Sequence, residues 1–127
     1  MRFMVQIERR KVRSNVRSEA VSLFLEHNAA RAGVRAVVLS DMSGFLIGGT
    51  GDIDQTVLAA IGPLFVTGSS PSLSDQTEAL VEDVVKNHDL YASRVQLDDR
   101  TLILTSIGGR FPEHRRAERA FQRILAS

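Results

Sequence analysis

The glycine-rich run Gly48–Gly51 is the segment of this chain that most resembles a phosphate-binding loop. Backbone N–H groups in such a loop attract anions, and so does the N-terminus of a following helix. A nucleotide-binding P-loop also needs a Lys and a Ser or Thr after its last glycine, whereas Asp52 and Ile53 stand there. Asp52 and Asp54 would also repel a phosphate group at the helix start. We therefore predict a structural corner rather than a nucleotide site.

The other residue types that bind metals or perform catalysis lack the necessary spacing. His27, His88 and His114 are too far apart in sequence to form a metal-spaced pair, and the chain has no cysteine. Glu78 and Glu82 share a face of a predicted helix, where a solvated acidic surface outweighs a cation site. No Ser, His and Asp set has the local context of a nucleophilic triad. The sequence therefore predicts no enzyme, no catalytic residue, no metal and no cofactor.

The net charge of +1 conceals a strong segregation of charge along the chain. Residues 1–17 hold six basic residues against one acid, residues 40–99 hold ten acids against two bases, and residues 110–127 hold five arginines against two glutamates. If the two ends lie together, they form a basic surface that can steer a charged partner. The alternative is a set of solvated helix faces with salt bridges. The candidate partner-binding residues are Arg9, Arg10, Lys11, Arg13, Arg115 and Arg116.

Nucleic acid is a minority interpretation of these basic residues. Phosphate contacts would suit them. However, the chain has one Tyr and no Trp, and it lacks the alternation of aromatic and basic residues that base stacking requires. A protein partner explains the cluster equally well.

Length and composition predict one ordinary globular domain. The chain has 127 residues, of which 43% are hydrophobic and 24% charged. Its longest apolar runs are too short to span a bilayer, and charged residues interrupt any signal-peptide core near the N-terminus. We therefore expect a cytoplasmic protein without a transmembrane segment.

Hydrophobic periodicity divides the N-terminal half into an arm, a helix and a hairpin. Alternation at Phe3, Val5 and Ile7 predicts an extended arm or an extra strand within residues 1–13, ahead of a domain over residues 14–127. Ser14 or Asn15 is expected to cap a helix that ends before Gly33. Residues 35–41 and 45–49 form a predicted hairpin, with a glycine at position 44 that suits a positive φ.

A helix is predicted to begin at Asp52, where Gln55 completes a capping box. A kink or break is expected at Gly62 and Pro63, because proline removes a backbone donor. After a loop over residues 67–72, another helix starts at Ser74 or Asp75.

Residues 90–97 and 101–107 form a second predicted hairpin, and a final helix begins near Pro112. Gly108 and Gly109 either end the sheet or bend into one more short strand. Tight hairpins in both halves imply an antiparallel sheet, so the predicted class is α+β.

This order of elements resembles the roadblock domain family, which is related to dynein light chains and to bacterial GTPase-regulating polarity proteins. The resemblance covers about residues 14–126 and rests on the hairpin from Gly33 to Gly51, the acidic-capped helix behind it, the second hairpin and the closing helix Ala117–Leu125. It implies a three-layer, roadblock- or profilin-like sandwich. Its five-stranded antiparallel sheet would carry the first and last helices on one face and the middle helix on the other.

The same resemblance implies a non-enzymatic homodimer that acts as a regulator or scaffold for a small Ras-like GTPase. Its dimer surface would consist of the middle helix and the adjoining edge strand. The corresponding residues are Ile53, Val57, Leu58, Ile61, Tyr91, Ser93 and Val95. In the family the middle helix is usually long and unbroken, whereas Gly62, Pro63 and a serine-rich loop divide it here.

A second hypothesis is a small-molecule sensor domain of PAS or profilin-like type. Such a domain needs a concave pocket on the sheet, with polar groups placed among apolar ones. The strands offer mainly apolar and small residues such as Ala36, Val38, Leu102 and Leu104, which favours helix packing over a pocket.

Overall fold

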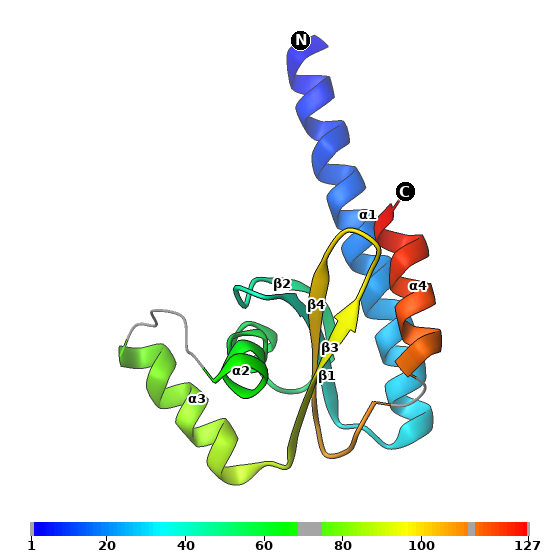
Figure 1. The fold of residues 1–127 in the computed structure, drawn as a ribbon. Helices are drawn as coiled ribbons and strands as arrows, with labels where there is room; N and C mark the ends of the chain where they lie inside the picture. The colour runs from blue at the N-terminus through cyan, green and yellow to red at the C-terminus, as the bar shows by residue number, and fades with distance from the viewer. Residues whose placement is uncertain (1, 69–74, 112–113, 127) are drawn as a thin grey trace.

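A computed structural model of the chain describes the backbone of residues 2–68, 75–111 and 114–126, and the side chains within this part from residue 16 onward, except that of residue 114. The described residues form four helices and a four-stranded antiparallel sheet, which is an α+β arrangement (Figure 1). The elements are α1 (Arg2–Ala32), β1 (Ala36–Asp41), β2 (Leu46–Gly51), α2 (Gln55–Thr67), α3 (Asp75–Asn87), β3 (Leu90–Gln96), β4 (Thr101–Ile107) and α4 (His114–Ala126). None of these helices is long and apolar enough to cross a membrane.

The two predicted hairpins are confirmed, and they join through their first and last strands. The strand order is β2-β1-β4-β3, and each neighbouring pair is antiparallel. β1 is central, and its residues from Ala36 to Ser40 are buried, as a strand with both faces covered must be. β2 and β3 form the two edges of the sheet.

The fifth strand expected from the family resemblance is absent from the described residues. After β4, Gly108 adopts a φ of +85° and its N–H donates to the carbonyl oxygen of Asp89. The chain therefore turns out of the sheet, and Phe111 is buried against Phe24, with ring centroids 6.3 Å apart. The expected additional strand was wrong because the apolar residue after the glycines belongs to the core beneath α1 and α4.

The helices cover the two faces of the sheet in the arrangement that the resemblance implied. α1 and α4 lie side by side on one face, whereas α2 covers the other and α3 packs beside α2 (Figure 1). Alternate residues of β1 serve the two cores. Val37 and Leu39 pack with residues of α1 and α4, and Ala36 and Val38 pack with residues of α2 and α3.

α1 begins earlier than its predicted cap. Its backbone is helical from Arg2, so Ser14 and Asn15 lie inside the helix, and the extended arm or strand expected at Phe3–Ile7 is wrong. A helix satisfies its backbone hydrogen bonds internally, whereas an additional strand would need a partner in the sheet. The predicted boundary between residues 13 and 14 therefore falls within α1.

The C-terminal end of α1 was predicted correctly. Gly33 has a φ of +70°, and the N–H of Val34 donates to the carbonyl oxygen of Ala29 at 3.0 Å. This six-to-one hydrogen bond belongs to a Schellman motif, which depends on a residue that tolerates the left-handed conformation.

α1 also shields the β2 edge of the sheet. A Cβ atom at Gly48 would lie 2.8 Å from Val21 Cγ1, so only glycine permits this close approach. Beside it, the N–H of Gly49 donates to Ser22 Oγ at 3.1 Å. The helix thus occupies a backbone donor of an edge strand that would otherwise be available to pair.

α2 differs from its prediction at its start and in its middle. Its N-cap is Asp54, whose Oδ1 accepts from the N–H groups of Thr56 and Val57, so the capping box predicted at Asp52 does not form. Of the kink or break expected at Gly62 and Pro63, the break is wrong, because α2 continues as one helix to Thr67. Both residues are buried, and their packing against the sheet maintains the helix despite the missing proline donor.

Candidate partner interface

Four of the residues predicted for the dimer surface are core residues of a single chain. Val57, Leu58 and Ile61 of α2 are 0–5% exposed, and Val95 of β3 is 0% exposed. The first three pack into the core between α2 and the sheet, and Val95 into the core beneath α1 and α4. Their prediction as surface residues is therefore wrong. The apolar stripe of α2 is buried against the sheet of the same chain, so it cannot also contact a partner.

Three predicted interface residues keep accessible surface. Ile53 is half-buried beside the core under α2, whereas Tyr91 and Ser93 are exposed on β3. Tyr91 and Ser93 lie on the edge strand that the resemblance assigned to the dimer. No other described strand pairs with the outer edge of β3.

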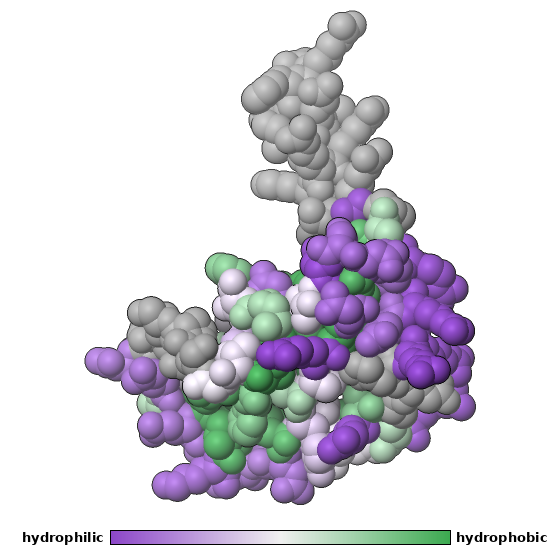
Figure 2. Space-filling model, in the orientation of Figure 1, coloured by the Kyte–Doolittle hydropathy of each residue, from purple (hydrophilic) through white to green (hydrophobic). Residues whose placement is uncertain are grey.

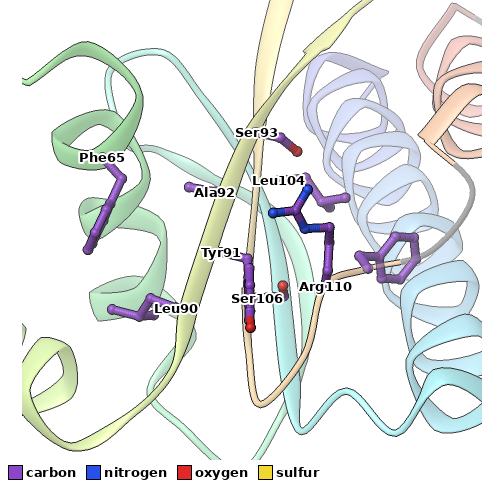
Figure 3. A pocket seen from close by; sticks show the side chains of 9 residues that line it. Phe65, Leu90, Tyr91, Ala92, Ser93, Leu104, Ser106 and Arg110 are labelled. Atoms are coloured by element: carbon purple, nitrogen blue, oxygen red, sulfur yellow. The ribbon is translucent and has the colours of Figure 1, made fainter.

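The β3 edge is flanked by apolar side chains that sequence periodicity did not place on the surface. Phe65, near the end of α2, is 50% exposed and lines the same hollow as the half-buried Leu90 (Figure 3). Figure 2 shows the apolar surface that lies between the α2–α3 side of the molecule and β3. We call this region the β3-edge groove, which has a volume of about 540 Å³ and is lined by Phe65, Leu90, Tyr91, Ala92, Ser93, Leu104, Ser106, Arg110 and Phe111.

One guanidinium group stands at the β3-edge groove. The Arg110 guanidinium carbon lies 5.5 Å from the centroid of the Tyr91 ring, within the range of a cation–π contact (Figure 3). Ser106 Oγ donates to the carbonyl oxygen of Gly109 at 2.7 Å and so fixes the loop that carries Arg110. The arginine and the tyrosine are 19 positions apart in sequence and meet only because β3 pairs with β4, so no local spacing could have revealed the pair.

The chemistry of the groove is that of a binding surface. It combines apolar contact area, the hydroxyl groups of Ser93 and Ser106, one arginine and the outer edge of a strand. A strand edge of this kind binds another extended chain through main-chain hydrogen bonds, while the flanking side chains select the partner.

The predicted basic surface is described only in part. Arg115 and Arg116 are exposed on α4, whereas the side chains of Arg9, Arg10, Lys11 and Arg13 lie outside the described residues. α1 and α4 carry the two basic segments and lie side by side, but the N-terminal part of α1 projects beyond the sheet (Figure 1). α3, which carries four of the acids, lies on the opposite side of the sheet (Figure 1).

The glycine-rich run has no phosphate-binding geometry. Residues 48–51 belong to β2 rather than to a corner, and Gly48 and Gly49 are buried. The first N–H groups of α2 are already occupied by the carboxylate of Asp54. The predicted corner is therefore part of a strand.

Comparison with known proteins gives one structural likeness. No family model matches the chain, and no curated protein matches it in sequence. Among solved structures, the gliding protein MglB from Thermus thermophilus is similar, with 12% sequence identity over 87% of this chain and 91% of that chain and a TM-score of 0.45. A TM-score of this size describes a shared outline and carries no argument about function.

Proposed function

We propose that this chain is a non-enzymatic, homodimeric regulator or scaffold that binds a small Ras-like GTPase. Two points support the proposal. The sequence resembles the roadblock domains, and the helices lie on the two sheet faces in the order which that resemblance implied. The observation that carries the proposal is the outer edge of β3, with which no other described strand pairs. An unpaired strand edge beside exposed apolar side chains is a typical protein-binding surface.

The dimer is proposed to form across this β3 edge. Two antiparallel copies of β3 would extend the sheet across a two-fold axis, so the same residues would face each other in both copies. Phe65 and Tyr91 would be buried in that contact, being 50% and 37% exposed in one chain. This assignment keeps the edge strand of the expected interface and replaces the buried α2 residues with exposed ones.

The GTPase is proposed to bind by positional recognition. A dimeric sheet with helices on both faces would hold the switch regions of the GTPase, and the basic α1–α4 side would steer an acidic partner. Of the residues predicted for that side, Arg115 and Arg116 have described side chains, and Arg9, Arg10, Lys11 and Arg13 extend it in sequence.

A binding measurement with purified Ras-like GTPases from the source cell tests this function. Each GTPase is loaded with GDP or with a non-hydrolysable GTP analogue and passed over the immobilised chain. We expect saturable binding that depends on the nucleotide and weakens in an Arg115→Gln, Arg116→Gln variant. Lys86→Gln and Arg100→Gln, which change exposed basic residues outside α1 and α4, form the matched control. Absence of binding in both nucleotide states would rule the function out.

The sensor hypothesis has one observation in its favour, the volume of the β3-edge groove. About 540 Å³ lies within the range of small-molecule pockets, and Arg110 suits an anionic ligand. A thermal-shift screen with anionic metabolites tests it. A ligand that raises the melting temperature of the wild type but not of Arg110→Gln would favour the sensor over the dimer, since both use the same groove.

A further inference from the structure

Two outer helices carry stripes of opposite charge with identical spacing. On α3, the acidic stripe consists of Asp75, Glu78 and Glu82, at positions i, i+3 and i+7. On α4, the basic stripe consists of Arg116, Arg119 and Arg123, again at i, i+3 and i+7. These six residues lie at the surface of the chain. Residues three and four apart lie on one face of a helix, so each stripe is a continuous line of like charge.

The two helices have equal and opposite net charge. α3 holds four acids and one lysine, which gives −3, and α4 holds four arginines and one glutamate, which gives +3. They lie on opposite sides of the sheet, α3 outside α2 and α4 beside α1 (Figure 1). Within one molecule the stripes therefore cannot neutralise each other.

Each stripe contains a pair of like charges four residues apart, Glu78 with Glu82 and Arg119 with Arg123. Like charges at this spacing repel each other, and on α3 Lys86, four residues after Glu82, offsets part of that repulsion. An opposite stripe with the same spacing would convert this repulsion into attraction.

The basic stripe also borders a surface hollow. Its three arginines border a hollow of about 610 Å³ between α4 and the β3–β4 turn. Gln122 shapes that hollow by accepting the N–H of Asp98 through its Oε1 at 2.9 Å. The carboxylates of Asp98 and Glu118 border the hollow as well and moderate its positive charge.

We propose that the chain associates head to tail with further copies of itself, with the acidic stripe of one copy lying against the basic stripe of the next. Because the two surfaces differ and lie on opposite sides, the contact does not close on itself as a two-fold dimer does. It generates open chains of molecules. The β3 edge takes no part in the contact, so the proposal is independent of the proposed dimer.

The association is weak and sensitive to salt. Exposed ion pairs each contribute about 0.2–1 kcal/mol, so three of them strengthen association by roughly 3- to 150-fold. Screening over about 10 Å at 0.1 M salt removes most of this gain. Sedimentation velocity at low salt should therefore show a mass that grows with protein concentration. At high salt the mass should return to that of the dimer proposed to form across the β3 edge.

Charge reversal tests the pairing directly. Asp75→Arg, Glu78→Arg and Glu82→Arg together make both stripes basic, whereas Arg116→Glu, Arg119→Glu and Arg123→Glu together make both acidic. We expect neither variant alone to grow in mass at low salt. A mixture of the two should regain the growth, because each stripe then meets an opposite one.

A matched control separates the effect of the stripes on association from the effect of the change in net charge. Glu19→Arg, Glu26→Arg and Asp99→Arg change three exposed acids outside both stripes and add the same charge as the α3 reversal. If this control suppresses growth as strongly as the α3 variant, or if the mixture fails to regain it, the proposal is overturned. If a charge-reversed variant does not fold, the neutral variant Asp75→Asn, Glu78→Gln and Glu82→Gln replaces it. We expect this variant, too, to show no increase of mass with concentration at low salt.

Discussion

Gly62 of α2 lies directly against Thr105 of β4: a Cβ atom at position 62 would lie 2.7 Å from Thr105 Oγ1. It would also lie 2.8 Å from Ile103 Cγ2. The absence of a side chain at this position thus sets how closely α2 approaches the sheet. In the sequence the Gly62–Pro63 pair suggests a helix break. In the structure both residues lie inside α2, where Gly62 allows the helix to pack closely against β4.

Gly62→Ala is therefore expected to destabilise the chain. Overpacking typically costs about 1–3 kcal/mol, which outweighs the roughly 1 kcal/mol that alanine gains over glycine in a helix. Urea denaturation measures the net loss. In a Thr105→Ala background the loss should shrink, because one of the two contacts is removed. An equal loss in both backgrounds would show that the two residues do not meet.

Thr105→Val is expected to raise stability. Thr105 Oγ1 is buried and has no hydrogen-bond partner among the described residues, and the same holds for Ser40 Oγ. An unpaired buried hydroxyl group costs about 1–3 kcal/mol, so an isosteric methyl group should recover part of that amount.

Thr101→Val on the same strand is the control for this prediction. The Thr101 hydroxyl donates to Gln96 Oε1 at 2.7 Å, so its loss should lower the free energy of unfolding or leave it unchanged. If Thr105→Val is the more destabilising of the two, Thr105 has a hydrogen bond that the structure does not show.

Asp54→Ala and Asp52→Ala distinguish the observed helix cap from the predicted one. Loss of the Asp54 carboxylate removes the acceptor for two N–H groups of α2, which costs about 0.5–2 kcal/mol. Asp52 instead pairs with Arg35 at 3.4 Å, with both side chains more than half exposed, so its loss should cost at most about 1 kcal/mol. Thermal unfolding of the two variants should rank Asp54→Ala below Asp52→Ala, and the reverse order would restore the sequence-based cap.

Phe65→Glu is expected to abolish the proposed dimer without unfolding the chain. The side chain is 50% exposed in one chain, so a charge costs little there in the monomer, whereas it would be buried in the proposed dimer. Light scattering should report half the mass of the wild type, with association weakened by at least about tenfold.

Phe45→Glu is the matched control, because Phe45 is 72% exposed in the turn between β1 and β2, away from the β3 edge. It should leave the mass unchanged. Both variants are measured at high salt to exclude head-to-tail contacts. If Phe65→Glu remains dimeric, the dimer surface does not include the β3 edge.

Local patterns predicted what depends on neighbours in sequence. Alternation gave both hairpins, Gly33 and Gly44 have the positive φ expected of them, and α3 begins at Asp75. Asp52 was preferred over Asp54 as the cap because Gln55, three residues after Asp52, suggests a capping box. The periodicity of α2 correctly predicted which face of the helix is buried. It could not predict that this face packs against the sheet of the same chain and not against a partner.

By itself the sequence determined the α+β class, the two hairpins, the segregation of charge and the lack of a P-loop, because each follows from residue type and short-range spacing. Tertiary structure alone decided that α2 passes unbroken over the sheet, that its apolar stripe faces its own chain, and that Phe65, Tyr91 and Arg110 line one groove. Those outcomes depend on contacts between residues far apart in sequence. The packing of Gly62 on Thr105, which permits α2 to lie so close to the sheet, is one of them.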